Sequence, residues 1–386
     1  MSNCKKLLIV GNPNAELTKE LVKAYRKKLP SLQIDCFALR PLESNQENVF
    51  DKIYNNSMFE WWTRNFKTRA RIGWLLGVLL NLIPNIIQHT RFSRYDVVQV
   101  QYVSLLHQYA MRFYRMIGKK IWIVFWGTDL FRCNRFDILG TIVKGADQIN
   151  CHTPELKQTL LENLPNASLS KKNWTQCFFG LTPLELISEF KEKQYSKLEL
   201  FNVLHIAPTD KKIIALGYNA SSAQQHLKVI ENLSDDVFSN AQIWLPMTYG
   251  NSSEYIRKVE KALIDKNADY VIIQEFMTNE QVAALRMLTD ILIQVQVSDS
   301  FSGSMQEHLY CGCLVITGSW LPYSTLIERG ILMLKVDQIS EIGGVITRAM
   351  SNFDELYENL QINPDIIESI SKWDNVIDNW VQATIK

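Results

Sequence analysis

Short apolar runs alternate with segments of helical periodicity along the first part of the chain. Short apolar runs bounded by turn residues are typical of buried strands. They predict strands at 6–11, 32–39, 96–103, 120–127 and 146–153, and the periodic segment at 16–29 predicts the helix that follows the first of them. Alternation of this kind indicates a parallel sheet with helices on both faces.

The alternation stops between residues 165 and 200, where the sequence is mixed and polar. We interpret this stretch as a connection between two units. A second series follows, with strands predicted at 211–218, 241–249, 270–274, 291–297 and 314–318. Helices are predicted between these strands at 224–233, 253–266, 279–288 and 303–312.

The two series predict two doubly wound, Rossmann-like α/β domains, one over residues 1–200 and one over 201–386. Open parallel sheets bind ligands at the carboxyl ends of their strands. Two such sheets are therefore expected to face one another across a cleft that suits the joining of two substrates. The helical tail from about residue 338 has a last helix of the kind that often packs back on the first domain.

Composition and charge narrow the class of protein. Hydrophobic residues make up 47% and charged residues 21% of the 386 residues, which is an ordinary globular balance. The net charge of +1 argues against a nucleic-acid-binding protein, because those usually carry a basic excess. The length suits two domains better than one.

The cysteines and the N-terminus both favour a cytoplasmic protein. The seven cysteines form no CxxC pair, and the one close pair, Cys311 and Cys313, lies in an apolar stretch. We expect reduced, buried thiols and no metal site, because no second Cys/His pair stands at ligand spacing. The apolar run after Lys6 is short and leads into a Gly/Asn/Pro turn, which favours a first strand over a secretion signal.

Two acids separated by seven residues, Asp299 and Glu307, frame the strongest chemical signal in the sequence. A turn of mostly small residues stands between them: Ser300, Phe301, Ser302, Gly303 and Ser304. Such a turn at a helix N-terminus presents backbone N–H groups and the positive end of the helix dipole to an anion such as a diphosphate. Carboxylates accept hydrogen bonds from sugar and ribose hydroxyls.

This segment resembles the E-x7-E donor motif of GT-B glycosyltransferases. Asp299 stands where the family has its first Glu, Ser302 stands where Gly is common, and Glu307 keeps the second acid. The resemblance implies that Asp299 lies near the donor sugar and Glu307 near the ribose, and we also regard Glu307 as a candidate catalytic residue. The alternative is that both acids are solvated residues of a turn and a helix start.

Two further segments resemble bacterial TDP-Fuc4NAc:lipid II transferases of the enterobacterial common antigen type. The matching positions are Gly217, Asn219, Ser221 and His226 in the first segment and Pro246, Tyr249, Gly250 and Tyr255 in the second. Gln224 and Gln225 replace the paired Asn of that family. The resemblance implies that backbone N–H, Ser and Asn groups hold the phosphates, together with His226. The alternative for His226 is a helix residue with a satisfied hydrogen bond.

The stretch before the helix at 279–288 would approach the nucleotide base. Phe276 and Met277 are candidates to pack on that base, or equally to belong to the core. We expect no cofactor and no metal, with a dTDP-sugar or UDP-sugar as the donor substrate.

Residues 59–95 combine basic and aromatic side chains beside an apolar run. Six basic residues oppose only Glu60: Arg64, Lys67, Arg69, Arg71, Arg91 and Arg94. Trp61, Trp62 and Trp74 lie among them, and the apolar run is too short and interrupted to span a bilayer. This composition favours a surface that lies on an anionic membrane, at the inner face of the cell membrane. The alternative is a buried helix pair with a solvated face.

Two loops of the first half are candidates for acceptor contacts. Gly127, Thr128 and Asp129 form a tight turn after a buried strand, and Gly11 and Asn12 follow the first strand. Asp129 is a candidate base if the reaction inverts configuration, whereas retaining GT-B enzymes require no such base. The alternative is that Asp129 caps the next turn or helix.

Together these patterns favour a glycosyltransferase that uses a nucleotide-diphospho-sugar, acting on a lipid-linked acceptor in bacterial surface polysaccharide biosynthesis. A nucleotide-sugar epimerase would have only Asp129 and Glu307 as acid/base candidates. A non-catalytic scaffold of the same fold in a glycan assembly complex is the alternative outside the enzymes. Nucleotide binding separates an enzyme from such a scaffold, because a ligand that binds the folded state stabilises it, and the scaffold should respond to no nucleotide.

Overall fold

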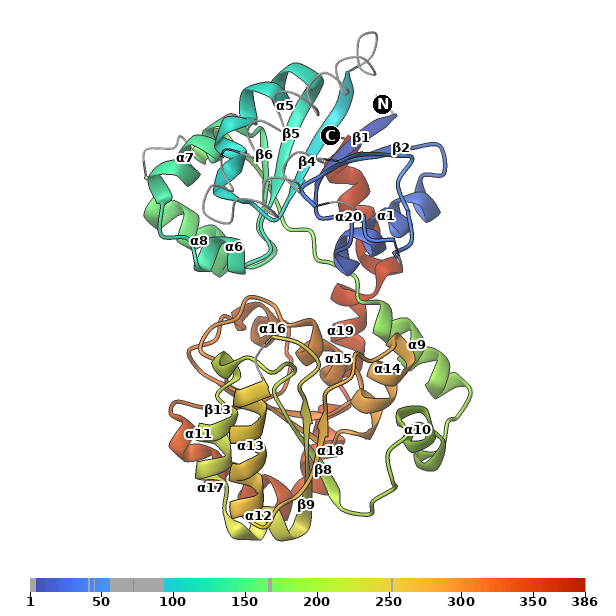
Figure 1. The fold of residues 1–386 in the computed structure, drawn as a ribbon, viewed down its shortest axis with the longest axis vertical. Coiled ribbons are helices and arrows are strands. Elements are labelled where there is room, and N and C mark those ends of the chain that lie inside the picture. The colour runs from blue at the N-terminus through green and yellow to red at the C-terminus, as the bar shows by residue number, and fades with distance from the viewer. Residues whose placement is uncertain are drawn as a thin grey trace. The chain divides into compact units, whose positions relative to one another are not determined.

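The computed structural model describes residues 5–40, 42–44, 46–55, 72, 94–165, 169–250 and 253–385. The chain forms two compact units, shown with their element labels in Figure 1. Unit 1 comprises Met1–Gly180 and Trp373–Lys386, and unit 2 comprises Leu181–Lys372. The boundary lies about twenty residues before the position 200 that we expected, because two helices of unit 2 occupy the stretch interpreted as a connection.

Unit 1 contains a parallel sheet in the order β3-β2-β1-β4-β5-β6-β7. Its strands are β1 (Lys6–Gly11), β2 (Gln33–Ala38), β3 (Lys52–Asn55), β4 (Tyr95–Gln101), β5 (Gly118–Val124), β6 (Gln148–Asn150) and β7 (Asn173–Thr175). Its helices are α1 (Glu16–Lys28), η2 (Leu105–Tyr109), α5 (Met111–Ile117), α6 (Thr128–Phe131), α7 (Phe136–Gly145), α8 (Pro154–Asn163), η3 (Leu169–Lys171) and α20 (Trp373–Ile385). The central strands are buried along almost their whole length, as a sheet with helices on both faces requires.

Unit 2 contains a second parallel sheet, in the order β10-β9-β8-β11-β12-β13. Its strands are β8 (Lys212–Leu216), β9 (Ala241–Pro246), β10 (Asp269–Ile273), β11 (Ile291–Gln294), β12 (Leu314–Gly318) and β13 (Leu334–Val336). Its helices are α9 (Thr182–Glu192), α10 (Lys197–Leu204), η4 (Ser222–Gln224), α11 (His226–Asn232), α12 (Asp235–Asn240), α13 (Ser253–Asp265), α14 (Asn279–Leu288), α15 (Gly303–Tyr310), α16 (Ser324–Glu328), η5 (Ile339–Glu341), α17 (Ile342–Ser351), α18 (Phe353–Leu360) and α19 (Asn363–Ser371).

The two doubly wound parallel sheets that the sequence predicts are confirmed. The predicted strands and helices match observed elements to within a few residues. The sequence analysis missed the outer strands β3, β7 and β13, which are three or four residues long and therefore give almost no periodic signal.

The last helix, α20, packs on unit 1 beside α1 (Figure 1). Trp380 is fully buried, and its Nε1 donates a hydrogen bond to the carbonyl oxygen of Phe178 over 2.6 Å. Its ring lies 5.4 Å from that of Trp122 on β5, measured between centroids. Thr384 and Tyr25 join α20 to α1 through a buried hydroxyl pair 2.9 Å apart. The helix is therefore part of the core of unit 1.

The basic, tryptophan-rich segment lies almost wholly outside the described residues. This applies to the membrane-facing candidates Trp61, Trp62, Arg69, Arg71 and Trp74. At the end of the segment, Arg94 is described, and its guanidinium donates to the carbonyl oxygen of Gly118 over 2.5 Å. No helix in the described ranges is long and apolar enough to cross a membrane.

We expect Trp380→Ala to lower the free energy of unfolding of unit 1 by about 3–5 kcal/mol, because it leaves a large cavity in the core. Urea unfolding followed by circular dichroism measures the change. Lys27→Ala is the matched control. It removes an exposed ion pair between Lys27 on α1 and Asp374 on α20, and it should cost less than about 1 kcal/mol. Equal effects of the two changes would show that α20 contributes little to the core.

Candidate functional site

The sheet of unit 2 changes direction between β8 and β11. From β8 the chain adds β9 and β10 on one side, and it then returns to add β11, β12 and β13 on the other. Loops that leave neighbouring strands in opposite directions open a crevice at the carboxyl ends of those strands, where doubly wound sheets bind ligands. The residues after β8 and β11 therefore define the candidate site of unit 2.

The loop after β8 begins at Gly217, which has a positive φ of 62°. A Cβ atom there would lie 2.7 Å from Oε1 of Gln224 and 3.1 Å from Nε2 of His226, so no larger residue fits without a shift. The loop is then fixed to the loop after β9, because the N–H of Ala220 donates to the carbonyl oxygen of Tyr249 over 2.7 Å. Asn219 closes a turn by accepting a hydrogen bond from the N–H of Ser221 over 2.8 Å.

The loops after β8 and β11 are also joined to each other. Gln225 donates from Nε2 to the carbonyl oxygen of Val295 over 2.7 Å, and the N–H of Val297 donates to that of Ala223 over 2.9 Å. Gln225 replaces an Asn of the resembled family, and here it serves as a link between loops. The three loops thus form one hydrogen-bonded wall.

Asp299 is held in place from inside the sheet. The hydroxyl of the buried Tyr323 donates to Oδ2 of Asp299, and Gln294 on β11 donates from Nε2 to that hydroxyl over 2.8 Å. Burial raises the pKa of Asp299, while the Tyr323 hydroxyl and the N–H groups of Ser300 and Ser302 act in the opposite direction. The carboxylate is ordered by these contacts, which a solvated turn residue would lack.

Glu307 forms a buried ion pair with Arg286. Nε of Arg286 lies 2.8 Å from Oε2 of Glu307, and the two side chains are 7% and 9% exposed. Arg286 comes from α14 and was missed by the sequence analysis. The signal that could have revealed it is its position on the buried face of that helix, among Ala283, Ala284 and Leu285. A charge there needs a partner.

The turn between the two acids leads into α15. Ser302 is the N-cap residue, and its Oγ accepts a hydrogen bond from the N–H of Met305 over 3.3 Å. A Cβ on Gly303 would lie 3.2 Å from Leu181 and 3.8 Å from Oε1 of Glu307, so the backbone approaches the acid closely. The first N–H groups of a helix have no partner within the helix and attract anions.

The structure brings Tyr249 into the same group as the acids. Burial raises the pKa of its hydroxyl, and the charges of Arg286, Glu307 and Asp299 all act on it. The side chain is nevertheless 52% exposed. Tyr249 therefore stands at the open edge of the cluster formed by Asp299, Glu307 and Arg286.

Two other donor candidates differ from one another in accessibility. His226 is buried, its Nδ1 lies 3.2 Å from the Tyr255 hydroxyl, and burial lowers its pKa to about 4. The imidazole is thus neutral at pH 7. Its Nδ1 has a partner in Tyr255, whereas its buried Nε2 lies beside Gly217 without a hydrogen-bond partner, so the alternative of a satisfied helix residue fits only in part. Phe276 is 82% exposed, so the alternative that placed it in the core is wrong.

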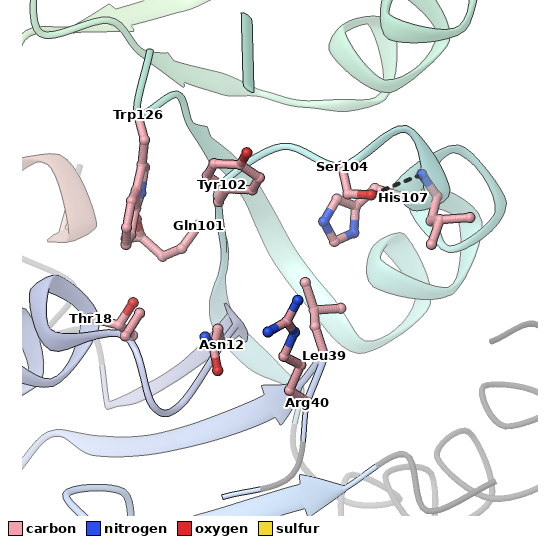
Figure 2. Close-up of a pocket in the computed structure, with 11 residues that line it drawn as sticks. Asn12, Thr18, Leu39, Arg40, Gln101, Tyr102, Ser104, His107 and Trp126 are labelled. Atoms are coloured by element: carbon pink, nitrogen blue, oxygen red, sulfur yellow. Dashed lines mark hydrogen bonds between the residues drawn. The ribbon is translucent and has the colours of Figure 1, made fainter. Parts of the chain in front are cut away.

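Unit 1 has a cavity of about 460 Å³ at the equivalent place in its own sheet. The change of winding direction lies between β1 and β4, and the cavity is lined by residues that follow β1, β2, β4 and β5 (Figure 2). The lining residues are Asn12, Ala15, Thr18, Leu39, Arg40, Gln101, Tyr102, Ser104, Leu106, His107 and Trp126. Of the acceptor-loop candidates, Asn12 lines the cavity, whereas Gly11, Gly127 and Thr128 do not.

Gly11 lies just behind the cavity wall. A Cβ on Gly11 would lie 3.3 Å from Cβ of Gln101, so the close approach of β1 and β4 requires a small residue. Gln101 accepts a hydrogen bond from Nε1 of Trp126 over 2.8 Å. Tyr102 has a positive φ of 59°, a strained conformation for a bulky residue that is typical of functional loops.

Asp129 closes the loops around this cavity. Its carboxylate accepts hydrogen bonds from the N–H groups of Val103, Trp126 and Gly127 over 2.8, 3.0 and 2.9 Å. Gly127 has a φ of 111°, which allows the turn. Because both carboxylate oxygens are engaged by the backbone, the geometry fits the capping alternative, and we assign Asp129 to positioning the loops after β4 and β5.

No group of three or more His, Cys, Asp or Glu side chains that could hold a metal ion occurs among the described residues. Four of the described thiols are buried, and Cys133 and Cys311 are partly exposed.

Comparison with known proteins identifies the architecture of the chain. No protein-family model matches the chain, and no curated protein matches its sequence. Among solved structures it is similar to a glycosyltransferase from Rickettsia africae, at 14% identity and a TM-score of 0.74 over 100% of this chain and 98% of that one. It is also similar to sucrose-phosphate synthase from Thermosynechococcus elongatus, at 12% identity and 0.72 over 98% of each chain.

A third similar structure is the E. coli trehalose-6-phosphate structure bound with UDP-2-fluoro glucose, at 13% identity and a TM-score of 0.67 over 99% of each chain. These likenesses cover both units. They confirm that the chain has the GT-B glycosyltransferase fold that the sequence predicts.

We expect Asp129→Asn to change how stability depends on pH. Burial raises the pKa of Asp129 to about 6, above its value of about 4 in an unfolded chain. The folded state therefore binds the proton more tightly, and the wild-type protein loses stability as the pH rises through this window. The difference in melting temperature between the Asn variant and wild type should thus shift in favour of the variant from pH 4 to pH 7. A constant difference would contradict this expectation.

Proposed function

We propose that the protein is a glycosyltransferase that moves a sugar from a nucleoside diphosphate sugar to an acceptor hydroxyl. The observation that carries this proposal is the pair of acids held on either side of the turn that begins α15, Asp299 by Tyr323 and Glu307 by Arg286, where the sheet of unit 2 changes direction. The carboxylates there can accept hydrogen bonds from sugar hydroxyls, and the neighbouring helix N-terminus attracts an anion. A sugar joined to a diphosphate needs both kinds of group. The GT-B fold agrees with it.

Each group has a defined role in this proposal. The N–H groups of Gly303 and Ser304, at the start of α15, donate hydrogen bonds to the diphosphate, aided by the Gly217 loop with Asn219 and Ser221. Asp299, oriented by Tyr323, accepts a hydrogen bond from a hydroxyl of the donor sugar. Glu307 uses Oε1 for the ribose hydroxyls, because its Oε2 is engaged by Arg286. The exposed Phe276 packs on the base of a uridine or thymidine donor.

In the reaction the acceptor oxygen forms a bond to the anomeric carbon, and the bond from that carbon to the diphosphate oxygen breaks. The acceptor hydroxyl gives up its proton, and the nucleoside diphosphate leaves with the bonding electrons. Preorganised N–H groups at the start of α15 stabilise the negative charge that develops on this leaving group. The contribution of the protein is therefore positioning and charge stabilisation by groups already in place.

The acceptor and the location are proposed from the sequence. The basic, Trp-rich composition of residues 59–95 supports binding to an anionic membrane surface from the cytoplasmic side. This supports a lipid-linked acceptor, as in bacterial surface polysaccharide biosynthesis, with Trp61, Trp62, Arg69, Arg71 and Trp74 as the contact residues.

The first test is a thermal-shift screen with UDP, dTDP, GDP, CMP and ADP. We expect one pyrimidine nucleoside diphosphate to raise the melting temperature with saturation, because it binds the folded state alone. Glu307→Gln should reduce that shift, since it removes the charge that accepts the ribose hydroxyls, while Glu368→Gln changes an acid of α19 outside the cluster and should not. A cooperatively melting protein that responds to no nucleotide would support the non-catalytic scaffold instead.

The second test separates substrate binding from turnover at Asp299. We expect Tyr323→Phe to lower kcat about tenfold, because the loss of one hydrogen bond to a charged group costs about 1.5 kcal/mol, while KM for the donor changes little. Sugar transfer is measured by release of the nucleoside diphosphate. Wild-type kcat in this variant would contradict the role of the Asp299–Tyr323 contact.

A further inference from the structure

We infer that the cavity of unit 1 binds a monosaccharide that carries an anionic group, such as a sugar phosphate. The cavity has the volume of a small-molecule site and lies where doubly wound sheets bind ligands. Its lining combines a cation, aromatic rings and buried polar groups. Each of these three features points to a different part of such a ligand.

Arg40 supplies the positive charge. The residue is exposed, and its guanidinium lies between Asn12 and Leu39, on the side that faces Ser104 and His107 (Figure 2). The lining residues that the structure describes include no Asp or Glu, and no described acid forms an ion pair with Arg40. A guanidinium that pairs with no acid of the described residues, at the edge of a cavity, is suited to a phosphate or a carboxylate, which it binds through two parallel N–H groups.

Thr18 and Gln101 supply unpaired polar atoms in the wall. Each side chain is 1% exposed, and Oγ1 of Thr18 and Nε2 of Gln101 have no hydrogen-bond partner in the structure. Buried polar atoms are nearly always paired, so their isolation indicates an absent partner. A sugar hydroxyl both donates and accepts hydrogen bonds, and it can therefore satisfy a hydroxyl and an amide N–H at neighbouring positions.

Trp126 and Tyr102 supply the apolar surface. Their rings meet edge to face with centroids 6.0 Å apart, and the hydrogen bond to Gln101 fixes the orientation of the indole. The two loops that carry these rings are also linked to each other, because the N–H groups of Val103 and Trp126 both donate hydrogen bonds to the carboxylate of Asp129. Fixed aromatic rings offer an apolar face on which the C–H groups of a pyranose pack.

This inference rests on the proposed function where it identifies the bound sugar as the acceptor, and it names the substrate class of that reaction. The anionic group has two sources, a free sugar phosphate or a sugar joined to a prenyl diphosphate. Both place a phosphate beside a pyranose and therefore present the same chemistry to Arg40.

The test is calorimetric titration of the full-length protein. The probes are hexose 1-phosphates, hexose 6-phosphates, hexuronates, neutral hexoses, inorganic phosphate and a short-chain prenyl-diphosphate sugar. We expect a charged sugar to bind more tightly than its neutral counterpart and than inorganic phosphate. Preference for the free phosphate or for the prenyl-linked sugar identifies the source. Equal affinity for charged and neutral sugars, or no binding of any probe at millimolar concentration, overturns the proposal.

Two variants test the residues. Arg40→Gln should weaken binding of the charged sugar about tenfold or more, because it removes a charge-assisted hydrogen bond. Arg112→Gln, at an exposed arginine on α5 outside the cavity, is the matched control and should bind normally. Thr18→Val should weaken binding several-fold without loss of thermal stability, since it removes a hydroxyl that has no partner. Wild-type affinity in both cavity variants contradicts the proposal.

The nucleotide titration on the same samples distinguishes the two proposals. A nucleoside diphosphate that still binds, with no binding of any charged sugar, would remove the sugar-binding role of the cavity and leave the proposed donor site intact. Binding of a charged sugar without binding of any nucleotide would remove the proposed donor site and leave the sugar-binding role of the cavity intact.

Discussion

The reversal of winding direction within each parallel sheet is the constraint on which both candidate sites depend. A parallel strand pair needs a crossover connection, and crossovers on opposite sides of the first strand send their loops apart. In unit 1 the reversal lies between β1 and β4, and in unit 2 it lies between β8 and β11. The central strands of both sheets are mostly apolar and buried, so polar chemistry collects at their carboxyl ends, where the backbone leaves the sheet.

The two sites differ in how their polar groups are held. In unit 2 the ion pair of Arg286 and Glu307 and the contact of Tyr323 with Asp299 hold the two acids from within the protein. Such pairing fixes the geometry of the acids before a ligand arrives, which lowers the cost of ordering them during binding. In unit 1 the cavity leaves Oγ1 of Thr18 and Nε2 of Gln101 without partners. The two acids of unit 2 are thus ordered before a ligand binds, whereas two polar atoms in the cavity wall of unit 1 have no partner in the protein.

The sequence predicts the sheets well because their central strands are short apolar runs between clear turn signals. The acid pair Asp299 and Glu307 could likewise be found from spacing. Long-range partners could not, since Arg286 lies 21 residues before Glu307 and Tyr323 lies 24 residues after Asp299, with no local pattern linking them. The role of Asp129 could not be predicted from the sequence either. Its residue type suggests a base, and only the structure shows that three backbone N–H groups from two loops donate hydrogen bonds to its carboxylate.

The place of α20 has a consequence for how the chain is built. Unit 2 is continuous from Leu181 to Lys372, whereas unit 1 needs Trp373–Lys386, which the ribosome delivers after all of unit 2. The first 180 residues therefore emerge with the site of Trp380, against Trp122 and Phe178, still uncovered. The part of the protein that is made first is the part completed last, and its exposed apolar face is a natural target for chaperones during synthesis.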